Sequence, residues 1–120
     1  CTGLKEIELP KSVTSLGPSA FKNCTNQSQV TLSPKIKEIS MNAFDGCTAL
    51  TEITLPEKCR EVVFFAFVNC SSLREVHMGA DVKSISYDAF YNCPNMSLHA
   101  PAGSYAESYA KEHNIPFVAE

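Results

Sequence analysis

The stretch CTALTEITLPEKCREVVFFAFVN, residues 47–69, decides the fold, because the chain repeats its pattern of residues every 23 positions. Cysteine opens this stretch and recurs at the same interval along the chain, at Cys1, Cys24, Cys47, Cys70 and Cys93. An Ala-Phe pair keeps the same interval, at residues 20–21, 43–44, 66–67 and 89–90. Two independent markers with one period indicate a stack of equivalent turns, each of which contacts only its neighbours.

Each turn carries its apolar residues at fixed positions. In residues 47–69, Leu50, Ile53 and Leu55 read L-x-x-I-x-L, which is the strand signature of a leucine-rich repeat. A second apolar pair follows in successive turns, at Val13/Leu16, Ile36/Ile39, Cys59/Val62 and Val82/Ile85. The pattern therefore predicts two short strands per turn, with the Ala-Phe segment as a short helical or 3-10 turn and its phenylalanines as a buried column. The residue before each inner cysteine is Asn or Gly, which favours a left-handed corner at Asn23, Gly46, Asn69 and Asn92.

The repeated turn C-x-x-L-x-x-I-x-L-P, followed by a V-x-x-I pair and by A-F-x-N-C, resembles the BspA-like class of leucine-rich repeats. Residues 101–106 and 114–117 resemble the terminal segment of that class. The fold expected is a right-handed, β-rich leucine-rich-repeat solenoid of α/β class. The resemblance also implies a secreted or cell-surface protein, although the chain shows no signal peptide, and adhesion to host matrix proteins or to other cells.

We expect residues 1–103 to form the repeats, with turns that begin at the five regularly spaced cysteines, and residues 104–120 to form a C-terminal cap. Ser104 and Glu107 give the S-x-x-E signature of a helix start. Apolar residues then recur at helical spacing, which predicts a helix over about residues 104–113, followed by an extended piece at 115–118. The first turn has no comparable cap, so we expect a longer array or self-association through this turn.

The cysteines predict buried free thiols. Parallel side chains on neighbouring turns keep Cβ atoms about 5 Å apart, whereas a disulfide prefers about 3.8 Å. No Cys-x-x-Cys spacing occurs, so we expect no metal and no cofactor. The sequence also lacks a Gly-rich phosphate loop and a G-x-S-x-G motif, and we expect no enzyme. His77, His99 and His113 fall at different positions of the repeat, and His77 beside Glu75 fits an exposed pair better than an acid–base couple.

A net charge of −3 over 120 residues gives no basic surface for nucleic acid, and no apolar run is long enough to enter a membrane. The candidate binding surface is instead the concave face of the first strands, between the inward positions. It comprises Glu6, Glu8, Gln29, Thr31, Glu52, Thr54, Glu75 and His77. Its acidic column could meet a basic partner, or could only keep the solenoid soluble. We therefore expect a module that binds an extracellular protein or glycan, and the alternative is a structural spacer in a longer repeat array.

Overall fold

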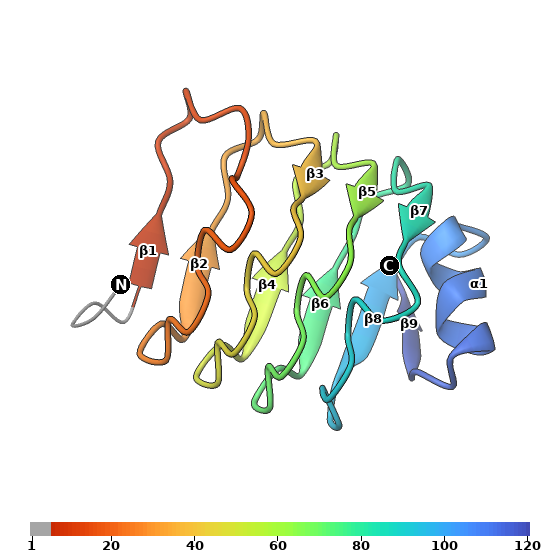
Figure 1. The fold of residues 1–120 in the computed structure, drawn as a ribbon. Helices are drawn as coiled ribbons and strands as arrows, with labels where there is room; N and C mark the ends of the chain where they lie inside the picture. The colour runs from red at the N-terminus through yellow and green to blue at the C-terminus, as the bar shows by residue number, and fades with distance from the viewer. Residues whose placement is uncertain (1–5) are drawn as a thin grey trace.

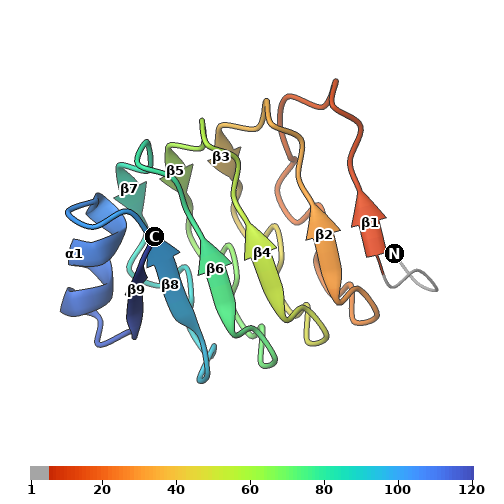
Figure 2. The same ribbon diagram turned by 180° about the vertical axis from the view of Figure 1, so that it is seen from behind.

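The computed structural model describes residues 6–120 as a stack of turns that advances steadily from the N-terminus to the C-terminus (Figures 1 and 2). The first strands of successive turns, together with β9 from the C-terminal cap, form one parallel sheet in the order β1-β2-β4-β6-β8-β9. Its strands are β1 (Glu6–Glu8), β2 (Gln29–Thr31), β4 (Glu52–Thr54), β6 (Glu75–His77), β8 (Ser97–Ala100) and β9 (Phe117–Ala119). The second apolar pairs form a smaller parallel sheet of β3 (Glu38–Ile39), β5 (Glu61–Val62) and β7 (Ser84–Ile85). The predicted solenoid with two strands per turn is confirmed, although residues 13–16 of the first turn form no strand.

The Ala-Phe segments stack the predicted aromatic column through the core. The rings of Phe21, Phe44, Phe67 and Phe90 are nearly parallel, with centroids 5.2, 5.1 and 5.3 Å apart between successive pairs. The segment itself is a run of tight turns, in which Cys47 N–H donates to the Phe44 carbonyl as in a 3-10 turn. Positive φ angles at Asn42 and Gly46 keep this run from extending into a longer helix.

The left-handed corners lie where the sequence predicts them. Asn23, Gly46, Asn69 and Asn92 have φ angles of 59°, 75°, 62° and 60°. A second left-handed position was not expected, and it comes four residues earlier in three turns, at Ser19, Asn42 and Phe65. Phenylalanine is a costly residue at a φ of 55°, because its Cβ crowds the following carbonyl there.

The predicted C-terminal helix is α1 (Tyr105–Glu112), and its ends are capped as the sequence suggests. Ser104 Oγ accepts a hydrogen bond from Glu107 N–H, and Glu107 Oε1 accepts one from Gly103 N–H. At the other end Asn114 has a φ of 56°, and Ile115 N–H donates to the Ala110 carbonyl, which gives a Schellman ending. Tyr109 joins the helix to the core through an edge contact with Phe90 at 6.4 Å and a hydrogen bond to the Ser86 carbonyl at 2.8 Å.

The cysteine column is mostly, but not entirely, as predicted. Cys47, Cys59, Cys70 and Cys93 are free. In three of them the thiol donates to the carbonyl of the phenylalanine in the preceding turn, at 3.0 Å for Cys47, 3.0 Å for Cys70 and 2.9 Å for Cys93. Cys24 is disulfide-bonded, so the expectation of a free thiol is wrong there. The argument from strand spacing gives the average separation of parallel side chains, and such an average does not forbid a disulfide where one pair departs from it.

Candidate functional site

The predicted binding residues share the outward side of the six-stranded sheet. Residues in a strand alternate between its two sides, so the residues that flank each buried Ile or Val point away from the core. We call these eight outward residues the polar sheet face: Glu6, Glu8, Gln29, Thr31, Glu52, Thr54, Glu75 and His77. Six of them are exposed, and Glu75 and His77 on β6 are partly covered.

The register brings the polar sheet face together as two columns. Glu6 lies opposite Gln29, Gln29 opposite Glu52, and Glu52 opposite Glu75. The other column runs from Glu8 to Thr31 and from Thr54 to His77. Opposed like charges on neighbouring strands are unfavourable, so the Glu52–Glu75 pair carries an electrostatic cost that a cationic partner would relieve.

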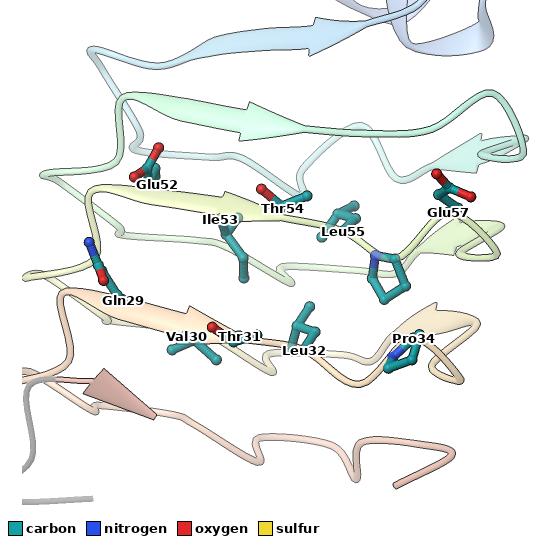
Figure 3. Close-up of a pocket in the computed structure, with 11 residues that line it drawn as sticks. Gln29, Val30, Thr31, Leu32, Pro34, Glu52, Ile53, Thr54, Leu55 and Glu57 are labelled. Carbon is teal, nitrogen blue, oxygen red and sulfur yellow. The ribbon is translucent and has the colours of Figure 1, made fainter. Parts of the chain in front are cut away.

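A hollow of about 490 Å³ lies between β2 and β4, over half of the polar sheet face (Figure 3). Gln29 and Glu52 lie at one end, and Pro34 and Glu57 lie at the other. The sheet ladder changes at this place. The only β2–β4 pair in register is Gln29 with Glu52, whereas β1–β2 and β4–β6 each pair over three residues. The hollow therefore lies where the two strands stop pairing.

Beyond β6, the sheet brings together four side chains of which the sequence indicated only two. His77 on β6 lies opposite His99 on β8, with ring centroids 4.5 Å apart. Glu75 and Glu120 approach the same two rings from either side. The expectation that His77 and His99 occupy different positions is thus wrong. The fifth turn is one residue shorter before its strand, so Val76 pairs with Leu98 at an interval of 22 residues.

The missed residues left a weak signal in the sequence. Glu75-x-His77 and Ser97-x-His99 are similar triplets in consecutive turns, and the apolar residues around them keep the 22-residue interval. Glu120 left no such signal, because it reaches the cluster only when β9 pairs with β8 and Glu120 N–H donates to the Ala100 carbonyl at 2.9 Å.

The charges of this cluster affect the ionisation of its members. Partial burial lowers the pKa of His77, but hydrogen bonds and charge from Glu120 and Glu75 outweigh it and raise that pKa above its ordinary value. The hydrogen bond from His77 in turn lowers the pKa of Glu120.

The buried thiols lie outside this cluster, and burial raises the pKa of Cys47 and of Cys59 to about 11. Thiolate chemistry is therefore disfavoured at these two positions.

A second exposed column, apolar this time, was not expected. Met41, Phe64 and Tyr87 follow one another at the 23-residue interval, and the first two precede the left-handed residues Asn42 and Phe65. Their exposed fractions are 46%, 53% and 77%. The chain therefore presents, besides the polar sheet face, an apolar surface that could contact a partner.

Comparisons with known proteins agree with the repeat. The profile of the BspA type leucine rich repeat region matches residues 1–102 in six copies. None of the curated proteins matches the sequence. Within residues 6–120, no helix has the length and apolar character needed to cross a bilayer.

Several solved structures resemble this one. A leucine rich cell surface protein from Faecalibacterium prausnitzii shares 31% identity over 89% of the chain, with a TM-score of 0.81. The T. pallidum leucine rich repeat protein shares 30% identity over 79% of the chain, with a TM-score of 0.75. A leucine-rich repeat protein from Bacteroides ovatus shares 28% identity over 88%, also with a TM-score of 0.75. The chain spans only 28%, 45% and 26% of these proteins, respectively.

Proposed function

This chain belongs to the BspA-type leucine-rich repeat family, and we propose that it is a non-catalytic binding module of a secreted or cell-surface protein. The polar sheet face is its contact surface, and the ligand is an extracellular protein or glycan to which the parent protein adheres. Leucine-rich repeats of this fold generally present a surface for binding. The description of the Faecalibacterium protein as a cell surface protein supports the location.

The observation that carries the proposal is the hollow between β2 and β4. Four residues of the polar sheet face line it, namely Gln29, Thr31, Glu52 and Thr54. Their amide, hydroxyl and carboxylate groups offer both donors and acceptors within one depression, which suits the hydroxyls of a glycan or the side chains of a protein loop. Each of these side chains lies on a strand that pairs fully with its other neighbour, β2 with β1 and β4 with β6, so a ligand that binds them orders little backbone.

The acidic column supports a partner with a basic contact surface. Glu6, Glu52 and Glu75 recur on one side of the sheet at fixed strand spacing, with Gln29 between the first two. A cationic partner would be attracted to this column before contact, and the attraction would weaken as salt rises. Salt dependence of the association rate is thus an expected property of the complex.

The test is a binding screen of the purified chain against immobilised extracellular-matrix proteins and glycans. One variant, Glu6→Lys with Glu52→Lys, reverses charge on the polar sheet face and leaves Glu75 in place. The matched control, Glu38→Lys with Glu61→Lys, makes the same change on exposed, paired positions of the three-stranded sheet. Both variants change the net charge equally, so a difference between them reports the location of the charge.

We expect the native chain and the control to bind and the polar-face variant to lose at least tenfold in affinity. Loss in both variants would reduce the effect to net charge and contradict the proposal. Binding that survives in both would place the contact elsewhere, with the apolar column of Met41, Phe64 and Tyr87 as the next surface to vary.

A structural spacer is the second candidate, and the lengths of the related structures favour it. The chain spans between 26% and 45% of the three proteins compared above, so repeats of this kind occur within much longer chains. A spacer would stack on further repeats of a longer array or on a second copy of the chain. Failure of the native chain to bind any immobilised ligand, with normal folding, would support the spacer.

A further inference from the structure

The C-terminal end of the six-stranded sheet holds a cluster of histidine and carboxylate side chains, of which Glu75 and His77 also belong to the polar sheet face. Glu75 and His77 come from β6, His99 comes from β8, and Glu120 follows β9. These three strands are consecutive neighbours in the sheet, and their register places His77 beside His99 and His99 beside Val118. The four side chains therefore converge because the sheet pairs, although 45 residues of sequence separate the first from the last.

We propose that Glu75, His77 and His99 bind one Zn²⁺ ion, and that Glu120 orients the two imidazole rings. The donor set of two imidazoles and one carboxylate is one that zinc uses in proteins when its fourth position holds water. This inference stands apart from the proposed function, because it needs no ligand on the polar sheet face.

The distances fit a tetrahedral ion. Glu75 Oε1 lies 3.2 Å from His77 Nε2 and 3.8 Å from His99 Nε2. Bonds of 2.0–2.1 Å to zinc place two ligand atoms about 3.3 Å apart. One donor atom from each of the three residues lies within 4.8 Å of the others, so rotations of side-chain ends are enough to close the site. The backbone that carries these side chains is already fixed, because Met78 N–H donates to the His99 carbonyl at 2.8 Å.

Glu120 supplies the second part of a zinc site. Its Oε2 lies 3.1 Å from His77 Nδ1 and 3.5 Å from His99 Nδ1. A carboxylate there favours the tautomers in which both Nδ1 atoms carry hydrogen, so both Nε2 lone pairs are left for the side where Glu75 lies. Carboxylates that orient ligating histidines in this way commonly affect metal affinity by about 10–100-fold.

The surroundings suit binding from solvent. The side chains of His77 and His99 are 23% and 13% exposed, so the protein shelters the rings and keeps them from turning freely. Glu75 is 46% exposed and leaves an open approach for the ion and for a water ligand. Ser97 Oγ, 2.9 Å from His99 Nε2, satisfies that nitrogen when no ion is bound.

The test is a titration of the purified chain with Zn²⁺ in a buffer that does not chelate it, followed by calorimetry. The variants His77→Gln and His99→Gln each remove one ligand, and Glu120→Gln removes the orienting carboxylate. His113→Gln is the matched control, because His113 is the third histidine of the chain and stacks on Tyr109 outside the cluster. Far-UV circular dichroism checks that each variant keeps its fold.

We expect one Zn²⁺ per native chain, at least tenfold weaker binding in His77→Gln and in His99→Gln, and an unchanged affinity in His113→Gln. Glu120→Gln should fall about 10–100-fold in affinity. The Co²⁺ form should show absorption bands of nitrogen and oxygen ligands without a thiolate charge-transfer band.

Three results would overturn the proposal. The first is a native chain that binds no Zn²⁺. The second is a zinc affinity that both folded histidine variants retain. The third is a thiolate band in the Co²⁺ form, which would assign the metal to cysteines instead.

Discussion

Phe67 is the central residue of the aromatic column, and its removal is the sharpest test of what holds the stack together. Its side chain is fully buried, and its ring stacks on Phe44 at 5.1 Å and on Phe90 at 5.3 Å. Truncation of a buried Phe to Ala typically costs about 3–5 kcal/mol. Two ring pairs, at about 0.5–1.5 kcal/mol each, place Phe67→Ala at the upper end of that range. A domain of this size has only about 5–15 kcal/mol of stability, so the change should leave the chain marginal.

The assay is equilibrium unfolding in urea with two probes. Circular dichroism reports the whole stack, and tyrosine fluorescence reports its end, since Tyr87, Tyr91, Tyr105 and Tyr109 all lie in the last turns and the cap. We expect Phe67→Ala to lower the free energy of unfolding by about 4–5 kcal/mol. Each turn contacts only its neighbours, so a weakened middle turn should also separate the two transitions. The milder Phe67→Leu, which keeps most of the volume, should cost about 1–2 kcal/mol.

A loss below about 1 kcal/mol in Phe67→Ala would refute the reasoning, because so small a cost is typical of exposed side chains. Tyr87→Ala provides that comparison, since Tyr87 is 77% exposed and lies outside the column. If Phe67→Leu costs as much as Phe67→Ala, ring stacking and not burial would dominate the column.

Three further changes test other parts of the structure. Phe65→Asn should stabilise the chain by about 0.5–1 kcal/mol, because Asn tolerates the φ of 55° that strains a bulky side chain, whereas Phe64→Asn should bring no such gain in the same urea assay. Burial raises the pKa of Cys59 from 9.0 to about 11, so its contribution to stability is complete below about pH 9 and declines as the pH rises towards 11. Urea unfolding across this pH range should show that decline, and Cys59→Val should make it smaller. Ser104→Ala should cost about 1 kcal/mol by thermal unfolding, because Ser104 caps α1, whereas Ser108→Ala on the exposed side of the helix should be nearly neutral.

The sequence alone determined the features that depend on the chemistry of single turns. Equal repeats place like residues in register, so the phenylalanine column and the two strands per turn could be read from the 23-residue period. The corners could also be predicted, because Asn and Gly tolerate positive φ whatever surrounds them. The helix start at Ser104 followed from a local capping signature, which needs no distant partner.

The candidate sites divide along the same line. The eight residues of the polar sheet face followed from strand alternation, but the hollow over them exists because β2 and β4 stop pairing after Gln29 and Glu52. The 23-residue period predicts that successive strands pair regularly, but the place where one pair of strands separates depends on the folded stack. Met41, Phe64 and Tyr87 recur at the 23-residue interval in the sequence, but only the burial of their side chains in the structure identifies them as an exposed column.

Only the tertiary structure decided the histidine cluster. One residue fewer in the fifth turn sets His99 beside His77 and not beside Val76, and a shift of one residue moves a side chain to the opposite side of a sheet. Glu120 joins the cluster because β9 pairs with β8. This contact joins the cap to the repeats, and the repeat pattern does not predict it. The sequence thus determined which side chains point outward in each regular turn, whereas long-range strand pairing decided which of them meet.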